Sequence, residues 1–184
     1  MSTGYSENSS LRRVQTIADY QFGGGAGAGL FPENCTFIFS TTGRIRQILL
    51  NDIRLATVRA SDGRLTLGIE GAVRLKRYLP VPSYRVVIRD DVAMFVAQGK
   101  NAFAKHVVGA DPQIRAGDEV LVVTHDDHLV ACGAAVISGT EMLAFNYGVA
   151  VRVRQGSEKD DSGKCEPTAD EGDDEEARYE RRTN

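Results

Sequence analysis

The chain has 184 residues, 42% of them hydrophobic, which allows one domain of ordinary size or two small ones with real cores. No run approaches the roughly eighteen apolar residues of a membrane helix, and the first ten residues, MSTGYSENSS, lack the basic-then-apolar order of a signal peptide. Cys35, Cys132 and Cys165 form no C-x-x-C pair, so neither a disulfide framework nor a zinc site is indicated. We therefore expect a cytoplasmic protein without a membrane partner, metal or cofactor.

The net charge of −3 is spread unevenly along the chain. Residues 157–184 carry eleven acidic and five basic side chains, whereas the preceding residues carry fourteen acidic and seventeen basic ones. Residues 157–184 contain too few apolar side chains to offset the entropy lost when a chain is ordered. We therefore predict an acidic disordered tail over 157–184. The tail is either a solubilising appendage or a mimic of nucleic acid that folds back on the basic body. Serine-rich residues 1–10 are predicted to form a disordered arm.

A small α+β domain is predicted over residues 11–83. Apolar residues at helical spacing indicate an amphipathic helix at residues 11–22, and the glycine-rich run GGGAGAG follows it directly. Pro80 and Pro82 mark the domain joint, because proline disfavours helix in the residue before it. The elements between these points are predicted as a strand, a hairpin, a half-buried strand and a helix, at residues 36–40, 45–59, 64–69 and 70–79.

The second domain, residues 84–156, carries stronger local signals. A strand RVVI is followed by a helix that Asp90 or Asp91 can cap and that Gly99 can end in the left-handed conformation. Ser138 and Glu141 have the spacing of a capping box for a second short helix that ends near Gly148. The remaining segments are predicted strands, of which the last alternates valine with arginine; they lie at residues 102–108, 119–123, 129–137 and 149–154.

Several stretches imitate catalytic or ligand motifs. The run from Gly23 to Gly29 follows a helix rather than a strand, so we interpret it as a hinge with close backbone packing, against the alternative of a phosphate cradle. The HDDH run, His125 to His128, sits at a predicted turn, where aspartates are expected, and the alternative is a metal site. No serine, cysteine or threonine lies in a recognisable nucleophile motif. We therefore expect no catalytic residues and no enzyme.

Arginines in the predicted hairpin suggest a binding face. A two-residue turn at Asn51-Asp52 would place Leu50 opposite Ile53, and the same register would pair Ile48 with Leu55, Arg46 with Thr57 and Arg44 with Arg59. Arg44, Arg46 and Arg59 would then share one face. Such a cluster needs anions, which are either phosphates of a nucleic acid or carboxylates of the same domain.

The second domain offers its own cations at a turn and at a strand end. Lys100, Asn101 and Lys105 follow the helix-ending Gly99, and two arginines, Arg152 and Arg154, close the sheet. Backbone amides at the glycine turn together with these cations suit a phosphate track. We predict RNA binding at Gly99, Lys100, Asn101, Lys105, Arg152, Arg154, Arg44, Arg46 and Arg59.

The order of elements in residues 84–154, with RVVI, GKNAFAKHVV, AGDEVLVV and GVAVRVR, resembles the PUA domain. The body as a whole, which also contains LRRVQTIADYQFGGGAGAGLFPE, GRIRQILL and LATVRASDGRLTLGIEGAVRL, is similar to the C-terminal portion of archaeal tRNA-guanine transglycosylase, the archaeosine enzyme. The resemblance implies an α+β chain: a patch-forming α+β domain, then a PUA-type mixed β pseudo-barrel with short helices.

In that family the PUA domain grips the acceptor stem of tRNA and its single-stranded end. The chain has neither the length of the catalytic barrel nor the family's zinc ligands. The resemblance therefore implies a non-catalytic protein that binds tRNA or another structured RNA. The alternative is an accessory subunit that docks onto an RNA-modification enzyme of this type and positions its substrate.

Overall fold

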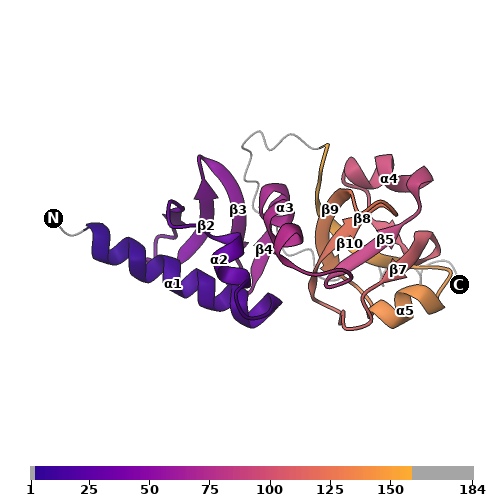
Figure 1. Ribbon diagram of the computed structural model, residues 1–184, viewed down its shortest axis with the longest axis horizontal. Coiled ribbons are helices and arrows are strands. Elements are labelled where there is room, and N and C mark those ends of the chain that lie inside the picture. Colours follow the sequence, from indigo (N-terminus) through magenta and orange to yellow (C-terminus); the bar gives the residue numbers. More distant parts are fainter. Residues whose placement is uncertain (1–2, 159–184) are drawn as a thin grey trace, which may run out of the picture.

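The described part of the chain, residues 3–158, forms two α+β units that lie side by side along the long axis of this computed structural model (Figure 1). Side chains are described from residue 8 onward. Within these residues, no helix combines the length and the apolar character needed to cross a membrane. The acidic tail predicted for 157–184 lies outside the described residues from residue 159 on.

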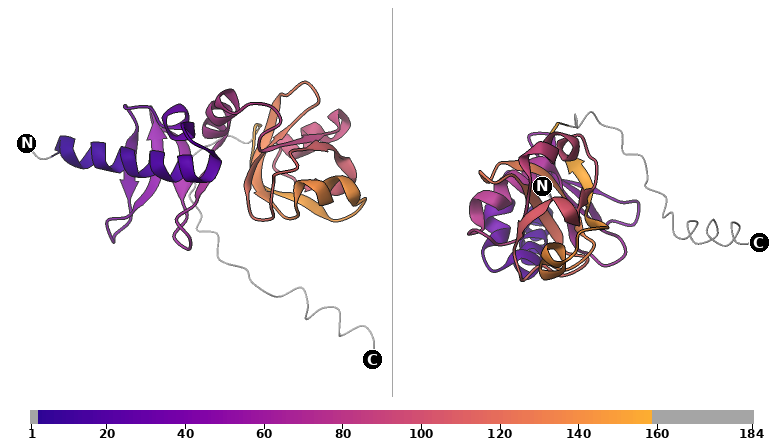
Figure 2. Two further views of the ribbon diagram at one scale, coloured as in Figure 1. Left: turned by 60° about the horizontal axis from the view of Figure 1, so that its bottom comes forward. Right: turned by 90° about the vertical axis from the view of Figure 1, so that its right-hand side faces the viewer.

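The N-terminal unit is a four-stranded antiparallel sheet with helices against it. Its strands follow one another in the order β1-β2-β3-β4, which leaves β1 and β4 as the edges. Figure 2 shows α1 running across these strands. The elements are α1 (Thr3–Phe22), α2 (Ala26–Leu30), β1 (Thr36–Phe39), β2 (Ile45–Leu50), β3 (Ile53–Val58), β4 (Leu65–Leu67) and α3 (Ile69–Tyr78).

Helix α1 is amphipathic, as its apolar spacing predicted. Val14, Ala18 and Phe22 are buried in the core, and Leu11 packs against the same cluster. The prediction of a disordered arm at residues 1–10 is wrong from Thr3 on, because the helix already begins there. The physical reason is cooperativity: once packing holds a helix at residues 11–22, each further residue adds a hydrogen bond without a new nucleation step.

The glycine-rich run lets α2 pack directly on α1. A Cβ atom at Gly27 would lie 2.3 Å from the backbone oxygen of Gln15, closer than any side chain tolerates. Gly25 has a φ of 87°, which only glycine adopts without strain. The N–H of Gly27 already donates to the Asp19 carboxylate at 2.7 Å. These contacts match the hinge interpretation, and one backbone donor that a phosphate cradle would need is occupied.

The hairpin of β2 and β3 turns where predicted but has a different register. Asn51 and Asp52 both have positive φ, 50° and 64°, as a two-residue turn requires. Leu50 lies opposite Ile53, but beyond Leu49 the pairing shifts by one residue. Leu55 is the inserted residue of a bulge, and the next pairs are Ile48 with Ala56 and Gln47 with Thr57.

The C-terminal unit is a mixed six-stranded sheet, nearly closed into a barrel, with two short helices. Its strand order is β6-β10-β9-β8-β5-β7, and β5 with β8 is the parallel pair. This confirms the predicted α+β class and the mixed pseudo-barrel. The elements are β5 (Arg85–Ile88), α4 (Asp90–Ala97), β6 (Ala102–Phe103), the 3-10 turn η1 (Ala104–His106), β7 (Val107–Ala110), β8 (Glu119–Val123), β9 (Leu129–Ala135), α5 (Gly139–Ala144) and β10 (Val149–Gly156).

The two short helices begin in different ways. Ser138 and Glu141 form the predicted capping box of α5, since the Ser138 hydroxyl accepts from the Glu141 N–H and the Glu141 carboxylate accepts from the Ser138 N–H. The helix ends earlier than predicted, at Ala144. Helix α4 has no side-chain cap: Arg89 occupies the capping position, and Asp91 binds the Arg89 guanidinium. The expected aspartate cap is therefore wrong.

Of the two buried apolar clusters in residues 3–158, one is shared by the two units and the other lies within the C-terminal unit. Leu121, Val123 and Cys132 of the C-terminal sheet belong to the same buried cluster as Leu55 and Leu75 of the N-terminal unit. At the joint, the Tyr84 hydroxyl donates to the Gln21 carbonyl at 2.6 Å, and the Tyr84 ring meets Phe22 edge-on at 5.5 Å. Because apolar side chains of both units are buried at this joint, the units can complete their cores only in this relative orientation.

Arg85 is a buried cation at the joint, with 3% of its surface exposed. Its Nε donates to Asp127 at 2.9 Å, and its other nitrogens donate to backbone carbonyls at the end of α3 and in the linker, those of Lys76, Leu79, Pro80 and Ser83. The Lys76 ammonium binds the second oxygen of Asp127 at 2.8 Å. A single guanidinium thus closes the carbonyl end of one unit's helix onto a turn of the other unit.

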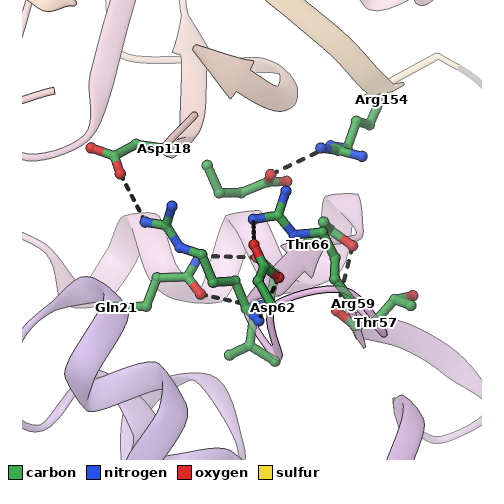
Figure 3. A network of polar contacts seen from close by, with 10 residues as sticks. Gln21, Thr57, Arg59, Asp62, Thr66, Asp118 and Arg154 are labelled. Carbon is green, nitrogen blue, oxygen red and sulfur yellow. Dashed lines mark hydrogen bonds and ion pairs between the residues drawn. The ribbon is translucent and has the colours of Figure 1, made fainter. Parts of the chain in front are cut away.

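A second polar network joins the two units (Figure 3). Glu119 is 4% exposed; it accepts the Leu67 N–H at 3.0 Å and pairs with Arg154 at 3.5 Å. Burial raises the pKa of Glu119, although the Leu67 hydrogen bond and the Arg154 charge oppose that shift. Asp118 binds Arg64 across the joint at 2.9 Å. These contacts satisfy polar groups that the joint removes from water.

Replacing Asp127 by asparagine should lower the free energy of unfolding by about 1–3 kcal/mol at neutral pH, because Arg85 loses a charged partner while it stays buried. Asp127 is 37% exposed, so solvent screening keeps the loss below that of a fully buried pair. Partial burial raises the pKa of Asp127, but hydrogen bonds and charges from Lys76 and Arg85 lower it by more, and the net shift is downward.

The Asp127 contribution is therefore complete above the unfolded-state pKa of about 3.9 and disappears as the pH falls through the lower folded-state value. Urea unfolding from pH 3 to pH 7 checks this expectation. The neighbouring exposed carboxylate offers a matched control in Asp126→Asn, which should leave stability unchanged. A loss that is equal at every pH would contradict the ion-pair explanation.

Candidate nucleic-acid interface

Helix α4 ends in a turn that only glycine makes comfortably. Gly99 has a φ of 94°. Its N–H donates to the Val96 carbonyl at 2.9 Å, and the Lys100 N–H donates to the Phe95 carbonyl at 3.1 Å. These bonds satisfy two carbonyls at the end of the helix and reverse the chain within two residues. Lys100 and Asn101 follow at once, and both are exposed.

The Asn101 side chain ties this turn to the last strand of the sheet. Its Oδ1 accepts the N–H of Val153, in strand β10, at 3.1 Å. The strand that follows the turn, β6, then pairs with the beginning of β10, Phe103 lying opposite Val149. The turn at Gly99 is therefore held at both ends, which keeps the Lys100 backbone close to strand β10.

A pocket of about 250 Å³ opens beside the turn. Its walls are mostly apolar, and its polar groups come from the turn and from η1. It is somewhat smaller than the roughly 300–1,000 Å³ of pockets for drug-sized ligands, so it suits one planar ring system. The lining residues are Ile88, Val92, Phe95, Val96, Lys100, Asn101, Ala102, Phe103 and His106.

His106 adds an unpaired polar atom to this pocket's lining. Its Nδ1 is buried and finds no hydrogen-bond partner within residues 3–158. A buried nitrogen without a partner costs about 1–3 kcal/mol, which a ligand group could offset. Lys100 at the rim and Lys105, exposed on η1, supply positive charge along the same chain segment.

The aromatic walls of the pocket are the functional candidates that the sequence prediction missed. Phe95 is 59% exposed and Phe103 is 43% exposed, although both are large apolar residues. The helical positions of these residues were the available signal. Helix α4 buries Val96 and Ala97, whereas Met94 and Phe95 lie on its solvent-exposed side. Large apolar side chains that a helix leaves in solvent beside a basic turn indicate a binding surface.

The predicted strand cations have different surroundings. Arg152 is exposed on β10, whereas Arg154 is 41% exposed at its side chain and pairs with the buried Glu119. Figure 3 shows Arg154 reaching into the network between the two units. The structure therefore gives Arg154 a structural partner in addition to its predicted role in RNA binding, and that role stays a prediction.

The predicted face that Arg44, Arg46 and Arg59 would share is wrong. The bulge at Leu55 moves the register by one residue, and continuing it from the Gln47–Thr57 pair sets Arg59 opposite Ile45 rather than opposite Arg44. Arg59 binds Asp62 at 2.6 Å (Figure 3), which matches the local carboxylate alternative for this residue. Arg44, directly before β2, and Arg46, on β2, are exposed. Their contact with RNA stays a prediction.

The HDDH run forms the turn between β8 and β9. Asp127 has a φ of 58° and serves the Arg85 ion pair described above. Within the described residues, no group of three or more histidine, cysteine, aspartate or glutamate side chains could hold a metal ion. Cys35 and Cys132 are buried, and burial raises the pKa of the Cys35 thiol to about 11.

Comparison with known domain families defines the class of this protein. Residues 12–82 match the patch-forming domain C2 of tRNA-guanine transglycosylase, and residues 84–156 match the PUA domain. The chain is thus a patch-forming domain followed by a PUA domain. More particularly, it is homologous to the C-terminal region of archaeal tRNA-guanine(15) transglycosylase, as the sequence resemblance predicted.

Individual relatives show how close this relationship is. The tRNA-guanine(15) transglycosylase of Pyrococcus abyssi is 51% identical over 147 residues, which cover 80% of this chain and 25% of that protein. The corresponding protein of Thermococcus kodakarensis is 50% identical over 146 residues, with 79% and 25% covered. The chain therefore spans about a quarter of the length of these relatives.

Two solved structures share the fold at low sequence identity. A hypothetical protein of Pyrococcus horikoshii superimposes with a TM-score of 0.66 and 21% identity, covering 83% of this chain and 92% of that one. A conserved PUA domain protein from Thermoplasma acidophilum gives a TM-score of 0.57 and 17% identity, with 84% and 92% covered. The arrangement of the two units therefore recurs in other archaeal proteins.

Replacing Gly99 by alanine should destabilise the protein by about 1–2 kcal/mol, because a φ of 94° forces a Cβ atom against the backbone. Chemical unfolding measures the loss. Gly24→Ala is the control, since Gly24 is exposed, has no positive φ and has open space where a Cβ would lie. Equal stability of the two variants would contradict the strained turn.

Proposed function

We propose that this protein binds tRNA or another structured RNA in the cytoplasm, without catalysing a reaction. The observation that carries the proposal is the pocket at the end of α4, where apolar and aromatic walls meet the exposed cations Lys100 and Lys105. PUA domains bind RNA, and this domain belongs to a chain homologous to part of a tRNA-modifying enzyme.

The chemistry of the pocket suits an unstacked base at a single-stranded end. Proteins that recognise single-stranded RNA hold unstacked bases against aromatic side chains. Phe95 and Phe103 are the aromatic side chains of this pocket. Lysines beside the pocket neutralise phosphates of the same strand. The polar atoms of Asn101 and His106 supply hydrogen-bonding groups at the wall, whereas the N–H groups of Gly99 and Lys100 already donate to carbonyls of α4.

Replacing Lys100 and Lys105 together by alanine should weaken tRNA binding and flatten its salt dependence. Each lysine that neutralises a phosphate contributes about 0.9 to the slope of log K against log salt, so the double variant should lose roughly 2. Filter binding of purified protein to tRNA across a salt series measures both quantities. Arg77→Ala removes an exposed cation of α3 in the other unit and serves as the control. An unchanged slope in the lysine variant would move the site elsewhere.

A second candidate function is that of an accessory subunit, which docks onto an RNA-modification enzyme of the tRNA-guanine transglycosylase type. One observation favours it: β1 is an open edge strand whose Ile38 and Phe39 are 46% and 47% exposed. The relatives are about four times longer than the region that matches this chain. In the proposed complex, the part of such an enzyme outside that region would supply the surface that contacts β1.

Ile38→Lys should abolish capture of such an enzyme and leave tRNA affinity unchanged, because the change puts a charge on the β1 edge. Val108→Lys, at an exposed site on edge strand β7 of the other sheet, is the control. Affinity capture with and without RNase treatment measures the outcome. A complex that dissolves with RNase in the unmodified protein would count against the accessory role.

A further inference from the structure

The last described residues of the chain lie against the end of helix α4. The Glu158 N–H donates to the Ala97 carbonyl at 3.1 Å. A Cβ atom at Gly156 would lie 2.0 Å from the Ala97 oxygen and 2.9 Å from the Gly99 nitrogen, so the two backbones are in direct contact there. The chain therefore continues into residues 159–184 from a point beside the turn at Gly99.

The two lysines that follow this turn have no carboxylate partner within residues 3–158. Lys100 and Lys105 are both exposed, and neither takes part in an ion pair among these residues. The cations of the joint differ in this respect, since Arg85 and Arg154 each bind a carboxylate. The basic segment, from Lys100 to Lys105, is therefore available to an anion from outside the described fold.

The sequence beyond Glu158 contains a run of carboxylates that can reach the basic segment. This acidic run, DEGDDEE at residues 170–176, has six acidic side chains and no basic one. The eleven residues 159–169 separate it from Glu158, and a chain of that length spans up to about 40 Å. Ala97, which Glu158 contacts, and Lys100 are three residues apart and hence at most about 11 Å from each other. The linker is therefore long enough to place the acidic run on the basic segment.

Covalent attachment makes even a weak contact between these two segments effective. A group joined to its site by a short linker acts at an effective concentration of about 1 mM, and this concentration falls as the distance to be spanned grows. The acidic run therefore meets the basic segment beside its point of attachment more often than it meets the cations of the N-terminal unit. At an intrinsic dissociation constant of about 0.1 mM, the attached run would lower the apparent affinity of a competing anion about tenfold.

We propose that the acidic run at residues 170–176 binds the basic segment of the same molecule and competes there with RNA. Of the two roles considered for the acidic tail, this is the mimic of nucleic acid rather than the solubilising appendage. Ligands held by charge alone lose most to such a competitor, whereas an RNA that also fills the pocket at α4 retains that additional contact. The competition rests on the proposed RNA-binding function, but the contact between the two segments does not.

Two-dimensional ¹H–¹⁵N NMR of the full chain without RNA tests the contact itself. The neutral-run variant carries Asp170→Asn, Glu171→Gln, Asp173→Asn, Asp174→Asn, Glu175→Gln and Glu176→Gln. The backbone signals of Lys100 and Lys105 should differ between this variant and the unmodified protein at about 50 mM salt, and should coincide at about 1 M salt, where the Debye length is about 3 Å. Arg77, an exposed cation of α3, is the control and should give the same signal in both proteins. Unchanged lysine signals, or equal shifts at Arg77, would overturn the contact.

Filter binding to tRNA tests the competition. At about 50 mM salt the neutral-run variant should bind about tenfold more tightly than the unmodified protein. The same six changes made together with Lys100→Ala and Lys105→Ala should raise the affinity about twofold at most over that of the lysine double variant, because the run has lost its site. A general effect of net charge predicts the same gain in both backgrounds, and that result would overturn the competition at the basic segment.

The two measurements separate this inference from the proposed function. If the unmodified protein binds tRNA through Lys100 and Lys105 but the neutral-run variant neither shifts their signals nor gains affinity, RNA binding stands and the inference alone fails. If no form of the protein binds tRNA, the proposed function fails and the competition fails with it. The NMR comparison then still decides whether the acidic run contacts the basic segment.

Discussion

Burial of Arg85 at the joint between the two units is the interaction on which the rest of this structure depends. Its guanidinium closes the carbonyl end of α3, holds the linker and pairs with Asp127 of the C-terminal sheet. A buried cation is stable only where hydrogen bonds replace its water, so this residue selects one arrangement of helix, linker and turn. The shared core around Leu121 and Cys132 then joins the units into one body.

A fixed joint matters for the proposed function, because structured RNA is recognised largely by its shape. The PUA domain alone offers the pocket and Lys100, but the patch-forming domain adds arginines and an open sheet edge at a set position relative to them. A structured RNA or a partner enzyme that touches both units would meet surfaces that do not have to be ordered on binding. Preorganised surfaces lose less entropy, and they discriminate by geometry.

Local sequence patterns predicted the elements well where chemistry between near neighbours decides the structure. The capping box of Ser138 and Glu141, the turn at Asn51 and Asp52, and the left-handed Gly99 all depend on residues within a few positions of each other. The position of Lys100 and Asn101 at the end of α4 was predictable for the same reason, because they follow that glycine directly; their contact with RNA stays a prediction. The start of α1 at Thr3 was not, since packing further along the helix stabilises it.

The sequence by itself thus determined the order of elements, the two-domain plan and the basic turn at the end of α4, because these follow from short-range periodicity and turn chemistry. Tertiary structure alone decided the bulge at Leu55 that separates Arg59 from Arg44, the pairing of Arg154 with buried Glu119, and the pocket walls at Phe95 and Phe103. Each of these depends on pairing and packing between different elements, whose energies local patterns do not encode.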